Sequence, residues 1–269
     1  MSAPESAFQR DTRVVPVGDG RFTGQVTERW NGISGQPLGG YVLAMALRAL
    51  RAQMPVPDPL VVAAFFLERV SPGPVELHTH VVRSGKRTAT GGVSVFHNGS
   101  EAMRVFATFA DLDRLTGPVA VFAAPPTLPS PEESVPLYDD PRQHGGTVAE
   151  QVDFRVARMP GWRMGMPSGR PSAEFWLRLT GGGDGDPLTL PFLVDCAAPA
   201  VVELGAIGTI TLQLTIHLYR RPAPGWLACR ATTTFLLDGH HEEDFEVWDR
   251  DGLMVAQSRQ LALIRQPAR

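Results

Sequence analysis

The order of segments along the chain repeats once, and this repetition constrains the fold more than any other feature of the sequence. In each half, a strand-like segment is followed by a glycine-rich loop, an apolar segment that favours helix, and a run of short β-rich segments. The turns keep a similar spacing, because Gly73 precedes Gly99 by 26 positions and Gly225 precedes Gly252 by 27. This period is far too long for a solenoid repeat, so it predicts an internal duplication of one α+β unit.

The first copy is predicted to combine one helix with an antiparallel meander. Ala, Leu, Met and Arg dominate residues 41–53 and favour a helix with one apolar face, which prolines at positions 55, 57 and 59 end. Turn residues such as Asn98-Gly99 separate the β-rich segments that follow. These segments are Leu60–Arg69, Val75–Ser84, Ala89–His97 and Ala102–Ala110.

A connecting segment separates the two copies. Residues 115–136 are rich in Pro, Ala and Val without a period, which is typical of a linker, and residues 141–169 are irregular. The second copy then starts with a strand, a glycine-rich turn, a helical segment at 190–204 and a second meander. Its expected elements are the strand Ala173–Leu179, the turn Gly181–Pro187 and the strands Thr209–Arg220, Trp226–Leu237, Glu242–Arg250 and Leu253–Ile264. We therefore divide the chain into an N-terminal unit (15–114), a linker and connecting segment (115–172) and a C-terminal unit (173–269).

Charge and hydropathy exclude several classes of partner. The 269 residues carry 25 Lys and Arg against 28 Asp and Glu, a formal charge of −3, and neither sign forms a sustained run. This balance gives no basis for binding nucleic acid or an anionic membrane surface. Because no apolar run reaches the ~18 to 20 residues of a membrane span and the first residues lack the apolar core of a secretory signal, we expect a soluble, cytoplasmic protein.

Several common catalytic and metal-binding motifs are missing from the sequence. The two cysteines, Cys196 and Cys229, lie in apolar surroundings without the spacing of a zinc site and are interpreted as core residues. A G-x-S-x-G elbow and a G-x-G-x-x-G fingerprint are both absent, which disfavours a serine hydrolase and a dinucleotide site. The histidines show no triad or metal pattern. We expect neither a metal nor a cofactor.

Asp195 is the most unusual ionisable residue, because it interrupts the apolar segment 190–204. A buried carboxylate without a partner costs several kcal/mol, so Asp195 is expected either to cap a helix start or to act as a base, and the two roles are compatible. Thr211 and Gln260 lie on strand faces from which they could meet it. Either one alone is better explained as solvated sheet surface, whereas together with Asp195 they could hold and activate one water molecule.

A set of short motifs connects the chain to a known family. The motifs are Trp30, Gly39-Gly40-Tyr41, Arg48, Phe65-Phe66-Leu67, Arg83-Ser84-Gly85-Lys86, Val255-Ala256, Gln260 and Ile264-Arg265. Over residues 20–111 and 173–265 the chain resembles thioesterase-like proteins related to type II acyl-CoA thioesterases. The resemblance implies a double hotdog, in which two units of a long helix wrapped by an antiparallel sheet are fused in one chain, and this matches the duplication.

The resemblance also implies an activity and a site. It implies hydrolysis of a fatty acyl-CoA to free acid and CoA, a reaction of lipid metabolism, by a water that Asp195, Thr211 and Gln260 orient, with Thr215 as a competitor for the hydroxyl role. Coenzyme A enters only as part of the substrate. For the oxyanion we expect backbone amides at a helix start, near Cys196 and Ala197 in preference to those of the Gly39-Gly40 turn. Gly39, Gly40 and Tyr41 are also expected to bind substrate. The candidates for the wall of an apolar acyl slot are Leu43, Met45, Phe65 and Phe66, and Arg83 belongs to a basic turn that could meet the CoA phosphates.

Two other functions remain open at this stage. A catalytically silent acyl- or acyl-CoA-binding hotdog protein would need Asp195 only as a cap. An acyl-CoA hydratase or dehydratase is disfavoured, because neither helical segment pairs a His with an acid. Hotdog sheets have edges and faces that commonly pair, so we expect a homodimer or a higher homo-oligomer.

Overall fold

The structure is a computed structural model that describes residues 5–138, 147–182, 185–206 and 208–264. Part of the predicted turn at Gly181–Pro187 and the motif residue Arg265 lie outside these ranges. Among the described residues, no helix has both the length and the apolar composition of a membrane-spanning segment.

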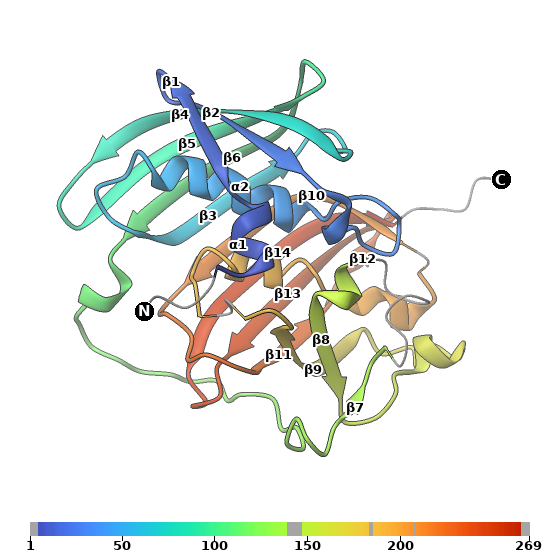
Figure 1. Cartoon of the computed structure of the whole chain (residues 1–269). Helices are drawn as coiled ribbons and strands as arrows, with labels where there is room; N and C mark the ends of the chain where they lie inside the picture. The colour runs from blue at the N-terminus through green and yellow to red at the C-terminus, as the bar shows by residue number, and fades with distance from the viewer. Residues whose placement is uncertain (1–4, 139–146, 183–184, 207, 265–269) are drawn as a thin grey trace.

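The first unit has the predicted helix and meander. Helix α2 (Gly39–Arg51) starts two residues before the predicted position, and it packs against the sheet from one side (Figure 1). The strands of the unit are β1 (Val14–Gly18), β2 (Arg21–Val26), β3 (Asp58–Phe66), β4 (Gly73–Ser84), β5 (Thr88–His97) and β6 (Ser100–Ala110). The four meander strands are confirmed. Strand β1 was missed, because its five residues contain Pro16 and show no alternation of apolar and polar side chains.

Helix α2 is buried almost all round and not on one face alone. Its side chains from Tyr41 to Leu47 are buried, including the alanines at 44 and 46. The sheet covers one side, and a short helix, α1 (Ala7–Asp11), with residues of the second unit covers the other. Phe8, Trp30 and Phe192 meet there, with ring centroids 4.8 to 5.3 Å apart. These aromatic contacts join the two units through the core.

Both units share one antiparallel sheet. The connecting segment contributes β7 (Val135–Pro136) and β8 (Val152–Val156). The strands of the second unit are β9 (Ser172–Leu179), β10 (Thr209–Leu218), β11 (Leu227–Thr232), β12 (Leu236–Leu237), β13 (His240–Trp248) and β14 (Met254–Ile264). The sheet order is β1-β2-β4-β5-β6-β3-β10-β14-β13-β11-β9-β8-β7, with β12 on β13. The units meet where β3 pairs with β10, from Phe65 opposite Gln213 to Val61 opposite His217. This duplicated α+β arrangement is the predicted double hotdog.

The helix predicted over residues 190–204 is the main error of the sequence-based fold. The segment forms a single helical turn, α4 (Leu190–Leu193), then a non-helical stretch with turns and bends at 194–199, then the 3-10 turn η5 (Ala200–Leu204). Pro199 precedes η5 with an extended backbone (ψ 147°) and has no N–H to continue a helical ladder. Asp195 therefore follows the end of a helix and does not start one.

The connecting segment is more ordered than predicted. Within residues 147–169, strand β8 pairs with β9, the 3-10 turn η3 (Thr147–Glu150) packs against β8, and the 3-10 turn η4 (Gly161–Met164) contacts η5. Glu203 of η5 is buried and accepts hydrogen bonds from the amides of Trp162 (3.3 Å) and Ser168 (2.5 Å). These bonds fix the η4 loop against the second unit, so it can form part of a pocket wall.

Candidate functional site

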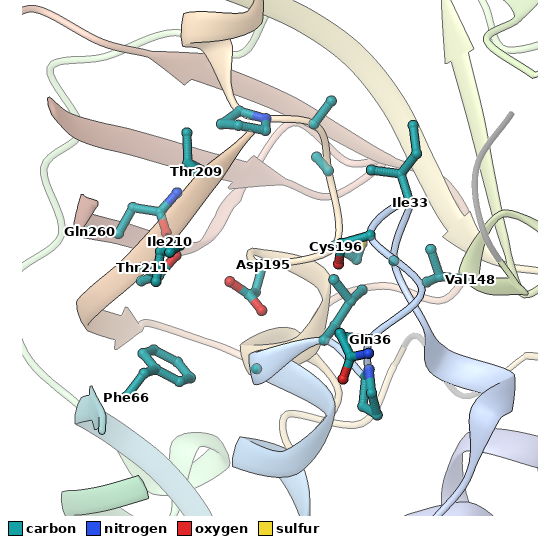
Figure 2. A pocket seen from close by; sticks show the side chains of 18 of the residues that line it. Ile33, Gln36, Phe66, Val148, Asp195, Cys196, Thr209, Ile210, Thr211 and Gln260 are labelled. Carbon is teal, nitrogen blue, oxygen red and sulfur yellow. Dashed lines mark hydrogen bonds between the residues drawn. The ribbon is translucent and has the colours of Figure 1, made fainter. Parts of the chain in front are cut away.

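A pocket of about 780 Å³ lies between the two units. Its wall combines the loop before α2, the ends of β3 and β10, the stretch after α4, and the turns η3 and η4. Asp195, Thr211 and Gln260 all line it. In Figure 2 an oxygen of Asp195 points toward the side of the pocket where Thr211 and Gln260 lie. The three residues predicted to form the site thus face one pocket.

Asp195 is held by the helix of the other unit. Its Oδ2 accepts a hydrogen bond of 2.6 Å from the backbone N–H of Gly40, in the first turn of α2. The N-cap residue of α2 is Leu38, whose apolar side chain cannot accept a hydrogen bond. Asp195 therefore caps α2 from a distance of 155 residues in sequence. The predicted capping role applies to a different helix from the one expected.

The close contact between Asp195 and α2 requires glycine at position 40. A Cβ at Gly40 would lie 2.8 Å from the Asp195 Cβ and 2.9 Å from the Pro191 carbonyl oxygen. At Gly39 it would lie 2.5 Å from Phe66 Cε1. The Gly39-Gly40 pair is thus explained by close packing at the junction of the units.

Burial raises the pKa of Asp195 to about 6, and the hydrogen bond from Gly40 acts in the opposite direction. A carboxyl group with this pKa is mostly ionised at neutral pH. It is also more basic than an ordinary aspartate, which suits a group that must take a proton from water.

Thr211 and Gln260 are neighbours on β10 and β14. The Thr211 Oγ1 donates a hydrogen bond of 2.8 Å to the Gln260 Oε1. A register irregularity follows Thr211, whose strand partner is the buried Ala262. Thr215 lies between the buried Leu214 and Ile216, so its side chain is on the opposite sheet face, where its hydroxyl accepts a hydrogen bond from Gln213 Nε2. Of the two threonines, Thr211 is the one beside Gln260.

Glu243 of β13 is a residue of this site that the sequence reasoning missed. It is 4% exposed, and its Oε1 accepts a hydrogen bond of 2.9 Å from Gln260 Nε2. Its Oε2 accepts one of 2.5 Å from the Ala200 N–H. Burial raises its pKa to about 7, and the charge of Asp195 adds to that shift. The alternation of side chains along β13 could have identified Glu243 as a buried acid, because it falls on the same face as the buried Phe245.

The other residues predicted to bind substrate are divided between the pocket and other places. Gly39 and Phe66 line the pocket. Gly40 meets Asp195. Tyr41 is buried in the core, where its hydroxyl donates to the Asp11 carbonyl oxygen at 2.9 Å. Leu43 and Met45 are fully buried core residues, and Phe65 points to the outer face of the sheet with half of its surface exposed.

Arg83 lies at the other end of the first unit from the pocket. It stands near the end of β4, in register with Thr90, at the end of the sheet where Ala110 pairs with Asp58. The pocket lies at the opposite end of β3, at Phe66. Sequence reasoning placed Arg83 at the site because the direction of a hairpin relative to a pocket cannot be obtained from turn spacing.

Both cysteines lie in the interior of the second unit. Cys196 and Cys229 are buried free thiols, and burial raises both thiol pKa values well above the ordinary range. Within residues 5–138, 147–182, 185–206 and 208–264, no group of three or more His, Cys, Asp or Glu side chains is arranged to hold a metal ion.

Two family models match the chain. The model described as the acyl-CoA thioesterase N-terminal domain matches residues 26–110, and the model described as the acyl-CoA thioesterase C-terminal domain matches residues 131–264. The second match begins before β8, so it includes part of the predicted connecting segment. Together the two matches span most of the chain and both halves of the sheet.

Individual proteins give a consistent picture. Over 266 residues the chain is 27% identical to an uncharacterised protein of Mycobacterium tuberculosis, with 90% of each covered. A solved structure from Thermobifida fusca, provisionally assigned as a thioesterase II, is 28% identical with a TM-score of 0.88, covering 98% of this chain and 99% of that one. A hotdog protein of unknown function from Alicyclobacillus acidocaldarius is 21% identical with a TM-score of 0.86, covering 97% and 99%, and this likeness shows the fold.

Proposed function

We propose that this chain, which belongs to the acyl-CoA thioesterase family, hydrolyses fatty acyl-CoA thioesters to the free acid and CoA by direct attack of water. The observation that carries the proposal is the convergence of Asp195, Thr211 and Gln260 on one pocket at the junction of the two units. The reaction needs no cofactor, and CoA leaves as a product.

The hydrogen bonds around Thr211 support a role in orienting the water. Because the Thr211 hydroxyl donates to Gln260 Oε1, its oxygen keeps lone pairs that can accept from a water in the pocket. The Asp195 carboxylate is a second acceptor. A water that donates to both presents its own lone pair to a thioester carbonyl carbon. Asp195 then takes one proton as the C–O bond forms, and returns it to the CoA sulfur as the C–S bond breaks.

The start of α2 supplies donors for the developing oxyanion. Gly39 lines the pocket in the first turn of a 13-residue helix, where amide N–H groups have no acceptor within the helix and the dipole favours negative charge. The alternative donors near Cys196 and Ala197 would require a helix that starts at these residues. No helix starts there, because α4 ends at Leu193 and η5 begins at Ala200. We therefore assign the oxyanion to the Gly39 amide.

The pocket lining supports an acyl substrate and a direct mechanism. Apolar side chains from the first unit and the connecting segment form much of its wall: Val42, Phe66, Met103, Tyr138, Phe154 and Trp162. Cys196 also lines the pocket, but its raised pKa keeps the thiol protonated and unsuited to forming an acyl-enzyme. Arg69 lies at the pocket with its surface exposed, so we assign it, in place of Arg83, to the CoA phosphates.

The test is release of free CoA from acyl-CoAs of graded chain length. We expect hydrolysis by the purified protein, and a loss of about 10²- to 10⁴-fold in kcat for Asp195→Asn, which keeps the shape but removes the base. Thr211→Val should also lower kcat, whereas its matched control Thr215→Val should not. Saturable binding of acyl-CoA without hydrolysis would instead indicate an acyl-binding protein, and an unchanged rate in Asp195→Asn would end the proposed mechanism.

A further inference from the structure

We propose that Glu243 is a positioning residue that fixes the amide orientation of Gln260, and thereby the direction in which the Thr211 hydroxyl donates. The inference rests on the proposed function. It concerns a buried carboxylate that contacts Gln260 directly and reaches the pocket only through it.

The first step is the chemistry of the carboxylate. An ionised carboxylate can only accept hydrogen bonds, whereas a glutamine side chain has one oxygen that accepts and one nitrogen that donates. Glu243 accepts from Gln260 at 2.9 Å and from the Ala200 amide at 2.5 Å. Gln260 must therefore turn its nitrogen toward Glu243. Its oxygen then faces Thr211.

The second step follows along the chain of bonds. With the Gln260 oxygen facing it, Thr211 donates its hydroxyl proton there, at 2.8 Å. The Thr211 oxygen is left as an acceptor in the pocket. If the Gln260 amide were turned over, its nitrogen would donate to Thr211, and the hydroxyl proton would point into the pocket. A water held between Asp195 and such a hydroxyl would lose one of its two acceptors and its attacking orientation.

The burial of Glu243 fits this role. A buried carboxylate costs stability unless its oxygens are satisfied, and the structure satisfies both, one with a backbone amide and one with Gln260. A hydrophobic residue on this core face of β13 would avoid the cost. The carboxylate has a chemical effect that an apolar residue cannot reproduce, because it specifies which end of the amide faces the pocket.

The test is a swap of the two side chains. In Glu243→Gln, the oxygen of the new amide must accept from the Ala200 N–H, so its nitrogen faces Gln260. Gln260 must then turn its oxygen toward residue 243 and its nitrogen toward Thr211, which reverses the direction of the hydrogen bonds. We expect kcat to fall about 10- to 100-fold, the size of one charge-assisted hydrogen bond, with KM within about threefold of wild type. The double variant Glu243→Gln/Gln260→Glu restores every donor and acceptor. Its kcat, at its own optimal pH, should exceed that of Gln260→Glu alone at least tenfold.

Asp58→Asn is the matched control for removing a buried carboxylate. Asp58 is also buried and also accepts from one backbone amide, Leu112 (3.1 Å), and one side chain, Arg221 (2.6 Å), but it lies at the far end of β3 from the pocket. This variant should lower the melting temperature and leave kcat unchanged. An unchanged kcat in Glu243→Gln would overturn the proposal. If that variant does not fold, a swap variant no faster than Gln260→Glu alone would overturn it.

A measurement without turnover separates this inference from the proposed function. The NMR signals of the Gln260 side-chain amide, assigned by their loss in Gln260→Glu, should shift when Glu243 is replaced or titrated. A wild-type protein that hydrolyses no acyl-CoA would refute the proposed function alone. An amide signal insensitive to Glu243 would refute the orientation role whatever the activity.

Discussion

The two units have the same strand order but use their helical segments differently. In the first, α2 runs unbroken for 13 residues and is buried almost all round. In the second, the corresponding segment forms one helical turn of four residues and then leaves the helix, through turns and bends from Asp195 to Pro199. The intact helix presents its N-terminus to the pocket, and the broken one presents a carboxyl group. The two copies of the fold thus contribute different parts of one site.

Local chemistry accounts for the difference. Residues 39–51 contain neither proline nor an acid, and their first turn begins with two glycines that allow close approach. The second segment carries Asp195 directly after the last turn of α4, and Pro199 prevents the helical ladder from continuing. The break lowers the helical content of the second unit. It also frees the Asp195 side chain to reach across the junction and cap α2.

Among the tests of this comparison between the units, the largest expected effect comes from disturbing the contact between Gly40 and Asp195. In Gly40→Ala, the new Cβ would overlap the Asp195 Cβ and the Pro191 carbonyl oxygen, so Asp195 must move. We expect kcat to fall about 100-fold, as displacements near 1 Å can cause in a preorganised site. Steady-state kinetics with acyl-CoA measures this. Gly117→Ala, at a glycine whose Cβ would meet open space, is the control and should be silent. Normal turnover in Gly40→Ala would show that the contact is unnecessary.

The sequence was sufficient for elements whose local signals agree. The Asn98-Gly99 turn has both residues at positive φ, 50° and 84°, as its hairpin chemistry predicts, and the strands on either side were correctly placed. Asp195 was found because an acid is conspicuous in an apolar run. These are properties of short segments, which neighbouring residues in the sequence determine.

What the sequence could not supply depends on contacts between distant segments. The composition of residues 190–204 predicted one continuous helix, because apolar residues are found in buried turns as well as in helices and do not distinguish the two. Glu243 was overlooked since its partners, Ala200 and Gln260, are brought to it only by the fold. Arg83 was misplaced because turn spacing does not tell at which end of a sheet a pocket lies.

The pH dependence of the reaction should sharpen the assignment of the base to the second unit. Burial raises the pKa of Asp195 to about 6, so the protonated, inactive form dominates below that pH. We expect kcat/KM to fall about tenfold per pH unit on the acid side. Glu243, with a pKa of about 7, adds an ionisation that overlaps with this one, because the two carboxyl groups interact.

Glu243→Gln provides the control for the pH profile. It removes the higher ionisation and the influence of that charge on Asp195, so its residual activity should follow a single ionisation at lower pH than in wild type. Initial rates between pH 5 and 9 in buffers of constant ionic strength would test this. A wild-type profile that is flat across pH 6 and 7 would contradict a carboxyl base at this site.

The smallest effect on turnover is expected from an ion pair that joins the units far from the pocket. Arg221, after β10, contacts Asp58 at 2.6 Å and Asp113 at 2.9 Å, both in the first unit. Arg221→Met leaves the buried Asp58 carboxylate with the hydrogen bond from the Leu112 amide but without its ion pair, and should lower the free energy of unfolding by about 2 kcal/mol. Chemical denaturation measures this loss. Adding Asp58→Asn should recover part of it, because the unpaired charge is then gone. Since the units also share the β3–β10 pairing and the aromatic core, kcat should stay unchanged, and a loss of turnover would mean that this ion pair helps to align the two halves of the site.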